Sequence, residues 1–124
     1  MLMDKTRLRA AALLLIAANA VAQGGADDAP WPVAGQQGLM RFVIVPADLA
    51  RDRSAYVKQI QRLCEPDRTC FLNFYTNSSG AALALPLPDA IDREATAVFR
   101  RSTKQGAESF RWSCRLQLPD DNCF

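Results

Sequence analysis

The chain has 124 residues, with 15 basic and 13 acidic side chains, a formal net charge of +2 and no histidine. Nearly balanced charge argues against nucleic acid as a partner, because affinity for a phosphate backbone comes from many clustered Lys and Arg. The lack of histidine excludes Ser-His-Asp and Cys-His catalysis, and also the zinc sites that contain histidine.

Residues 1–22 have the pattern of a secretory signal peptide. Lys5, Arg7 and Arg9 precede a short apolar run, and the segment ends at Ala22 with the small-x-small sequence Ala-Val-Ala. The apolar run is shorter than the roughly 20 residues that a membrane-spanning helix needs. We therefore expect cleavage after Ala22, no membrane span in the mature protein, and a periplasmic or secreted location. The segment holds three basic residues and one acidic residue, so the remainder has 12 of each (15 − 3 and 13 − 1) and is neutral.

The four cysteines are expected to be structural. An even count in an exported protein predicts disulfides rather than a metal or redox site, and the chain has no Cys-x-x-Cys motif. We therefore expect no cofactor and no metal. Three pairings are possible, and we prefer Cys64–Cys70 with Cys114–Cys123 because each closes a short loop. On the chain-entropy model, each such link stabilises a fold by about 2–3 kcal/mol.

A flexible leader and then a strand are predicted at the start of the mature chain. Residues 23–37 are rich in glycine, aspartate and proline, which is typical of irregular structure. Trp31 lies in this leader, and the sequence leaves open whether it packs on the domain. The apolar, β-branched run at 39–45 predicts a strand that is covered on part of both faces, and Pro46 ends it. A single disulfide-stabilised domain is expected over 38–124.

The next element is predicted to be a helix. Asp52 is a suitable N-cap, and Pro66 ends the segment. Its apolar residues recur at the spacing of one helical face, and polar residues take the opposite side. The predicted buried face consists of Tyr56, Ile60, Leu63 and Cys64. The predicted solvent face consists of Arg53, Lys58, Gln59 and Arg62.

A hairpin is expected next. A strand is predicted over 71–76, and the sequence Asn-Ser-Ser-Gly at 77–80 has the composition of a hairpin turn. Alternating leucines at 83–87 predict the partner strand, which two prolines keep short.

The C-terminal part predicts a second helix and a last strand. Pro88 and Asp89 start the helix, Gly106 terminates it, and its apolar residues fall on one face. The predicted buried stripe consists of Ile91, Ala95, Val98 and Phe99. Apolar and polar residues then alternate over 110–118, which predicts a strand with one face in the core and the other in solvent. A turn at 119–122 brings Cys123 back toward Cys114.

This order of elements is the ferredoxin-like βαββαβ order. It predicts a small α+β two-layer sandwich of about four strands, with two helices on one face. If 83–87 is not a strand, the alternative is a three-stranded βαβαβ layer. The chain resembles short exported proteins of Gram-negative bacteria, and the predicted order is similar to that of the peptidoglycan-binding sporulation-related repeat. The likeness is one of fold, because Pro46 stands after the first strand where that family has its glycine-containing motif.

Two groups of side chains are candidate binding surfaces. Asn73, Tyr75 and Asn77 fall on one strand face, and their amide and phenol groups can bind sugars or a peptide through hydrogen bonds and ring contacts. The second group is a basic cluster at the end of the second helix and on the solvent face of the last strand, where it can contact an anionic partner. This cluster consists of Arg100, Arg101, Lys104, Arg111 and Arg115.

The sequence offers few groups for catalysis. Ser54 and Lys58 lie one helical turn apart, but Lys58 belongs to the polar face, where it stays solvated. Asp89 and Asp92 fit the start of a helix better than a catalytic pair. We therefore expect a non-catalytic binding protein of the bacterial envelope, with another envelope protein as its partner. The alternatives are a peptidoglycan- or glycan-binding module, and a histidine-free hydrolase with clustered carboxylates.

Overall fold

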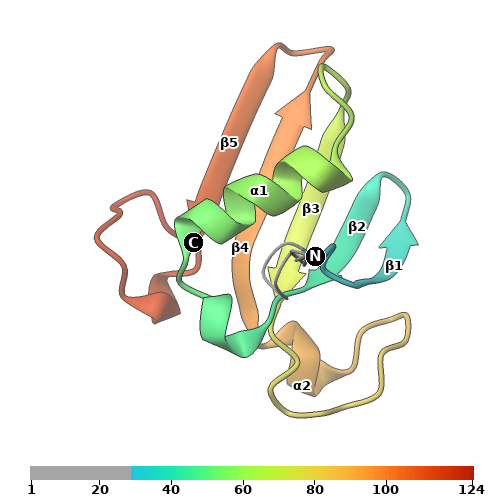
Figure 1. The fold of residues 1–124 in the computed structure, drawn as a ribbon, viewed down its shortest axis with the longest axis vertical. Coiled ribbons are helices and arrows are strands. Elements are labelled where there is room, and N and C mark those ends of the chain that lie inside the picture. Colours follow the sequence, from blue (N-terminus) through green and yellow to red (C-terminus); the bar gives the residue numbers. More distant parts are fainter. Residues whose placement is uncertain (1–28) are drawn as a thin grey trace, which may run out of the picture.

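The computed structural model describes residues 29–124, which form a five-stranded sheet with one long helix lying across it (Figure 1). The predicted signal peptide and residues 23–28 of the predicted leader lie outside the described residues. The strands are β1 (Val33–Gln37), β2 (Met40–Ile44), β3 (Cys70–Tyr75), β4 (Ala95–Ser102) and β5 (Ala107–Trp112). The helices are α1 (Arg53–Leu63) and the short α2 (Asp89–Asp92), with 3-10 turns η2 (Ala47–Leu49) and η3 (Cys114–Leu116).

The sheet is mixed, and its strands lie in the order β1-β2-β3-β4-β5. β2 and β3 are parallel, whereas the other neighbours are antiparallel. Parallel strands need a crossover connection, and α1 provides it. The β1–β2 hairpin turns at Gly38, where a φ of +62° favours glycine.

The predicted α+β two-layer class is confirmed, but the order of elements along the chain differs from the prediction. The chain runs strand, strand, helix, strand, short helix, strand, strand, instead of the ferredoxin-like βαββαβ or the three-stranded alternative. The predicted strand at 39–45, the helix after Asp52 and the strand at 71–76 are confirmed as β2, α1 and β3. None of the helices within residues 29–124 has the length and apolar character of a membrane span.

The main core lies between α1 and the sheet. Asp52 caps α1, because its carboxylate accepts the N–H of Ala55 (3.2 Å). Tyr56, Ile60 and Cys64 are buried, as the predicted apolar face requires.

Tyr56 stands at the centre of this core. Its ring lies 5.2 Å from that of Trp31, 5.0 Å from that of Phe74 and 4.9 Å from that of Trp112, all in edge-to-face contacts. Such contacts are worth about 0.5–1.5 kcal/mol each beyond the area they bury. Burial raises the pKa of Tyr56 to about 12; its hydroxyl donates to the carbonyl of Ala50 (2.7 Å) and lies 2.8 Å from Thr96 Oγ1.

The prediction of a flexible leader is wrong for the part that the structure describes. Trp31 is only 3% exposed, and residues 33–37 form β1, so the domain begins ahead of residue 38. Gln59, which was predicted on the solvent face of α1, is fully buried and anchors this segment. Its Oε1 accepts the N–H of Trp31 (2.9 Å), and its Nε2 donates to the carbonyl of Ala29 (2.8 Å).

The predicted second helix is wrong beyond its first turn. α2 ends at Asp92, and the chain continues as β4. β4 pairs with β3 on one side and with β5 on the other, so its backbone groups are hydrogen-bonded in both directions. Ala97 and Phe99 alternate onto the core face of this strand, whereas Val98, which was predicted in the buried stripe, falls on the opposite face and is only partly buried.

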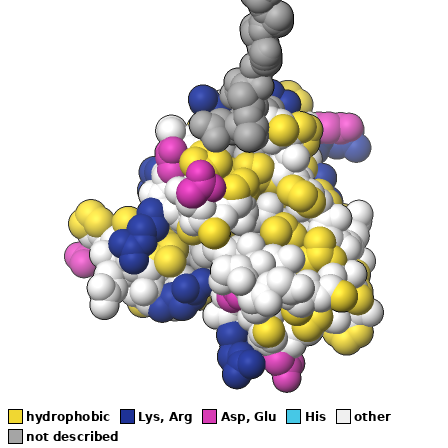
Figure 2. Space-filling model, turned by 60° about the horizontal axis from the view of Figure 1, so that its bottom comes forward, with side chains coloured by type: hydrophobic (Ala, Val, Ile, Leu, Met, Phe, Trp, Pro, Cys, Tyr) yellow, Lys and Arg dark blue, Asp and Glu magenta, His cyan; other side chains and the backbone are white. Residues whose placement is uncertain are grey.

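The predicted strand at 83–87 is also wrong, because β4 takes its place beside β3. The segment 76–94 instead packs over the other face of the sheet and closes a second, smaller core of Ile44, Tyr75 and Ile91. A Cβ on Gly35 would lie 2.5 Å from Leu85 Cδ1, so a larger residue at this position of β1 would have to displace the Leu85 side chain. Figure 2 brings this end of the molecule forward and shows hydrophobic side chains over much of its surface.

The last strand ends at Trp112 rather than at residue 118. η3 follows, and the chain then turns back so that its last residue pairs with the outer edge of β5. The N–H of Phe124 donates to the carbonyl of Trp112 (2.9 Å), and the N–H of Cys114 donates to the carbonyl of Phe124 (2.8 Å).

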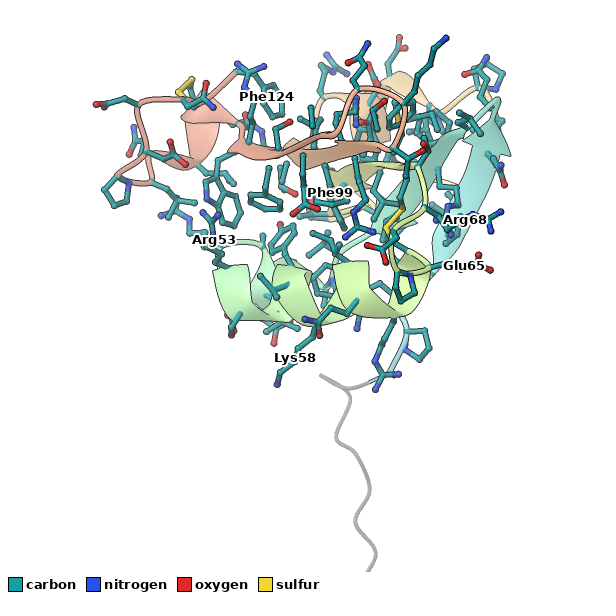
Figure 3. The ribbon with its side chains drawn as sticks, turned by 90° about the horizontal axis from the view of Figure 1, so that it is seen from above. Arg53, Lys58, Glu65, Arg68, Phe99 and Phe124 are labelled. Atoms are coloured by element: carbon teal, nitrogen blue, oxygen red, sulfur yellow. A yellow bond between two sulfur atoms is a disulfide. The ribbon has the colours of Figure 1, made fainter. Side chains whose placement is uncertain are left out.

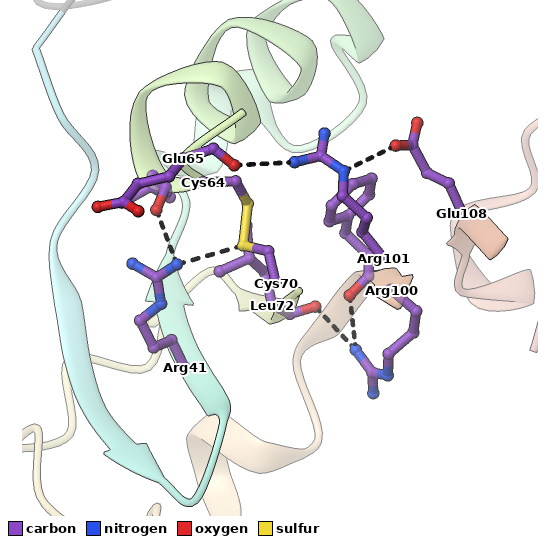
Figure 4. Close-up of a disulfide and its surroundings, with 10 residues drawn as sticks. Arg41, Cys64, Glu65, Cys70, Leu72, Arg100, Arg101 and Glu108 are labelled. Atoms are coloured by element: carbon purple, nitrogen blue, oxygen red, sulfur yellow. Dashed lines mark hydrogen bonds and ion pairs between the residues drawn. A yellow bond between two sulfur atoms is a disulfide. The ribbon is translucent and has the colours of Figure 1, made fainter. Parts of the chain in front are cut away.

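Both preferred disulfides, Cys64–Cys70 and Cys114–Cys123, are confirmed. The first joins the end of α1 to the start of β3 (Figure 4). Arg41 fixes the same corner, because its Nη2 donates to the carbonyl of Leu63 (2.7 Å) and lies 3.2 Å from Cys70 Sγ. The second disulfide holds the C-terminal tail beside η3.

Candidate functional site

The face of the sheet opposite α1, which we call the open face, carries the polar residues of β3. Side chains alternate along a strand, so Asn73 and Tyr75 share this face, whereas Leu72 and Phe74 are fully buried against α1. The predicted common face of Asn73 and Tyr75 is therefore confirmed. The segment 76–94 covers one end of the open face, where Tyr75 is buried.

Arg100 joins the two predicted surfaces. It stands opposite Phe71 in the register of β3 and β4. Its Nη2 donates to Asn73 Oδ1 (2.9 Å), and Asn73 Nδ2 donates in turn to the hydroxyl of Tyr75 (3.2 Å). We call Arg100, Asn73 and Tyr75 the polar row.

The guanidinium of Arg100 is held in a fixed position. Its Nη1 donates to the carbonyls of Leu72 (3.1 Å) and Phe99 (2.9 Å), as Figure 4 shows, and the group lies 5.8 Å from the ring centre of Phe71. Three of the five guanidinium N–H groups are engaged in this way, including the bond to Asn73. Within residues 29–124 Arg100 forms no ion pair.

Both ends of the polar row keep their protons at neutral pH. Burial lowers the pKa of Arg100 below its ordinary value, yet arginine remains charged in proteins. Burial also raises the pKa of Tyr75, and this outweighs the hydrogen bond from Asn73, which lowers it. Because the Tyr75 oxygen accepts from Asn73, the phenolic proton is available for a ligand.

Two hollows adjoin the polar row. One has a volume of about 350 Å³, and the other a volume of about 360 Å³. The first is lined by Gln37, Phe42, Asn73, Tyr75, Leu85, Pro86, Leu87 and Asp92. The second is lined by Phe71, Arg100, Ser102, Gln105, Ala107, Glu108 and Ser109. The row therefore lies between two concave, partly aromatic surfaces.

Asn77 is not part of the polar row. It follows the end of β3 and has a φ of +56°, in the left-handed region that asparagine tolerates better than most residues. Its Oδ1 is buried and has no hydrogen-bond partner in the part of the chain that the structure describes.

The structure separates the predicted basic cluster. Arg101 lies on the α1 face, where its Nε bonds Glu108 (2.9 Å), because neighbouring residues of a strand point to opposite faces. Lys104 is exposed in the turn between β4 and β5. Arg111 Nη2 donates to the carbonyl of Cys123 (2.9 Å). Arg115 Nε donates to the carbonyl of Ala95 (3.1 Å).

Two aromatic residues of the site were missed by the sequence interpretation. Phe71 lies beneath Arg100, and Phe42 lies next to Tyr75, with ring centres 6.2 Å apart. The alternation of β3 places Phe71 on the face of Asn73, so Phe71 could have been found from the period of the strand. Phe42 comes from a neighbouring parallel strand, and its place depends on the sheet order.

No three His, Cys, Asp or Glu side chains within residues 29–124 gather closely enough to hold a metal ion. Comparison of the chain with protein-family models, with curated proteins and with solved structures found no match. The polar row and its two hollows thus stand as the candidate binding site on their contacts alone.

Proposed function

We propose that the protein is a non-catalytic binding protein of the bacterial envelope, and that its open face binds a carboxylate-bearing ligand at the polar row. The single observation that carries the proposal is the guanidinium of Arg100, which is partly buried and fixed but has no carboxylate partner among the described residues. A partly desolvated charge without a counter-charge favours an incoming anion, and arginine binds carboxylates through charge-assisted hydrogen bonds.

The neighbouring groups support an elongated ligand. The phenol of Tyr75 can donate a hydrogen bond, and the rings of Phe42 and Phe71 offer apolar contact on either side of Asn73. Such a mixture of a few fixed polar groups with aromatic surface is typical of ligand sites. Two adjacent hollows suit a chain of several units better than a compact molecule.

Carboxylates in the envelope come from two sources, proteins and cell-wall glycan. We favour a second envelope protein, because aromatic and arginine side chains are enriched at the centres of protein interfaces. Peptidoglycan carries the same group and is the alternative. The two disulfides support an oxidising compartment, and the signal-like residues 1–22 support export to the periplasm or beyond.

The test compares Arg100→Gln with the matched control Arg68→Gln. Arg68 is a surface arginine whose ion pair with Glu65 is solvent-exposed, so its loss leaves the open face unchanged. We expect Arg100→Gln to weaken binding by about ten- to a hundredfold, the effect of losing a charge-assisted hydrogen bond, and Arg68→Gln to have no effect. Tyr75→Phe, which removes only the hydroxyl, should weaken binding by about tenfold.

Two binding experiments distinguish an envelope protein from peptidoglycan as the ligand. In one arm, each variant is sedimented with purified peptidoglycan; in the other, each is immobilised and exposed to periplasmic extract, and retained proteins are then titrated singly. Thermal unfolding of each variant verifies that the fold is intact. If Arg100→Gln behaves like Arg68→Gln in both arms, the open face is not the binding surface and the proposal fails.

A further inference from the structure

A second surface lies at the outer edge of β5. It shares Glu108 with one hollow of the open face but contains no residue of the polar row. Trp112 presents its carbonyl to the tail on that edge, whereas the N–H of Ser113 donates to Thr96 on the β4 side. In an antiparallel strand, the N–H and C=O of one residue point toward the same neighbouring strand, and those of the next residue point the opposite way. The N–H and C=O of Glu108 and Phe110 therefore point away from β4, and within residues 29–124 nothing pairs with them.

A hollow opens beside this edge, between β5 and α1. It has a volume of about 210 Å³ and is partly apolar. Its lining residues are Arg53, Val57, Ile60 and Gln61 from α1, Phe99 and Arg101 from β4, and Glu108 and Phe110 from β5. Figure 3 views the molecule from above and shows Arg53 on α1 near the space between the helix and the sheet, with Phe99 on the sheet side.

The unpaired charge at this hollow is positive. Glu108 is already bound to Arg101 (2.9 Å), whereas Arg53 lies 5.1 Å from the ring centre of Phe110 and forms no ion pair among the described residues. The edge and the hollow together thus offer main-chain donors and acceptors, an apolar cavity and a free cation.

We propose that an extended segment of a partner protein adds to the sheet along β5, places one long apolar side chain in this hollow, and sets an adjacent acidic side chain against Arg53. Addition of a strand to an exposed sheet edge gives affinity through main-chain bonds and specificity through pockets for alternate side chains. The same edge already accepts a segment in this manner, since Phe124 pairs with Trp112 and Cys114. That tail limits the added segment to the residues opposite 107–111.

A second copy of the chain fits this edge less well. The side chains that a paired β5 would offer on the α1 face are Glu108 and Phe110. Glu108 is bound to Arg101, and Phe110 packs against Tyr56 and Trp112 with ring centres 5.6 and 5.0 Å away. Neither side chain is free to fill the hollow of the other copy.

The test removes one outward N–H without changing the rest of the edge. Glu108→Pro deletes the donor, and proline is tolerated at an edge position whose N–H faces solvent. Its matched control, Glu108→Gln, loses the same ion pair with Arg101 but keeps the N–H. A second variant, Val57→Asp, places a charge in the hollow at a residue that is 43% exposed, so the fold is preserved.

The probe is an array of synthetic peptides of about seven residues, each with a central Leu, Met or Phe flanked by Asp, Lys or Ser. We expect binding only to members that combine the apolar residue with Asp, and protection of the Glu108 and Phe110 amides from hydrogen exchange in the complex. Glu108→Pro and Val57→Asp should each weaken this binding by about tenfold, while Glu108→Gln and Asn73→Ala leave it unchanged.

Three results would overturn the proposal: no binding by any member of the array, equal binding by Glu108→Pro and Glu108→Gln, or a dimer in sedimentation that Glu108→Pro dissociates. The last result would assign the edge to a second copy of the chain. Because Arg100→Gln tests the open face alone, failure of one surface leaves the evidence for the other intact.

Discussion

The side-chain amide of Gln59 hydrogen-bonds two main-chain groups of the segment before β1. It is fully buried, and it satisfies the N–H of Trp31 and the carbonyl of Ala29. Its position next to Lys58 in the sequence is typical of a solvent face. Its burial depends on a segment 28 residues earlier in the chain, so periodicity within α1 could not predict it.

Gln59→Leu is expected to destabilise the protein. Leucine keeps the volume of the side chain but leaves the N–H of Trp31 without a partner, which costs about 1–3 kcal/mol for a buried group. The control is Gln61→Leu, at an exposed position of the same helix, where a change within about 0.5 kcal/mol is expected. Urea unfolding measures both. Equal midpoints for the two variants would show that the anchor is unimportant.

At the scale of the elements, segments whose sequence fits only a helix or only a strand were predicted correctly, whereas segments that fit both were not. β2 has a nearly unbroken apolar sequence, and α1 has both a cap and a clear apolar face, so each was correctly predicted. The residues of β4 satisfy the spacing of a helix and that of a strand equally well. Pairing with β3 and β5 decides between them, and that information lies outside the segment.

β1 was missed for a related reason. Its sequence, Val-Ala-Gly-Gln-Gln, has little strand propensity, and it is held by its ladder with β2 and by the glycine turn between them. The candidate site shows the same limit. Asn73 and Tyr75 were placed correctly from the alternation of one strand, whereas the contact of Asn73 with Arg100 required the register of two.

The loop after β3 depends on one carboxylate. Glu94 accepts hydrogen bonds from the N–H of Ser78 (2.7 Å), the N–H of Ser79 (3.0 Å) and the hydroxyl of Thr76. Burial pushes the pKa of Glu94 up, but these hydrogen bonds outweigh it and lower the pKa below its ordinary value of 4.5. Its ionised form is therefore preferred in the folded state.

We expect the contribution of Glu94 to stability to be complete above its ordinary pKa and to be lost as pH falls through the lowered value of the folded protein. Glu94→Gln should flatten the dependence of the unfolding free energy on pH in this acidic range. Glu65→Gln, which removes an exposed carboxylate, is the control. Unfolding in urea from neutral to acid pH tests this, and identical pH profiles for wild type and Glu94→Gln would contradict it.

At the scale of the whole molecule, the two disulfides join cysteines six and nine positions apart and hold different ends of the core. Full reduction should raise the intact mass by about four units, two for each disulfide. Replacing Cys114 and Cys123 together by alanine should cost about 2–3 kcal/mol of unfolding free energy. The same change at Cys64 and Cys70 is the comparison.

Only the first of these double variants should also release the tail from β5, because Cys123 precedes the residue that pairs with Trp112. Hydrogen exchange of the Phe124 amide measures this release. Unchanged protection in the Cys114 and Cys123 double variant would show that the main-chain pairing alone holds the tail.

Each of the strands β2 to β5 pairs with the strand that directly precedes it in the chain. The two long connections between paired strands are the one that contains α1 and the segment 76–94, and no strand pairs with one that lies beyond the next strand in the chain. Contacts that are near in sequence form rapidly. A chain that appears N-terminus first, from a ribosome or a translocation channel, can thus complete its sheet strand by strand, with each new edge exposed only until the next strand arrives.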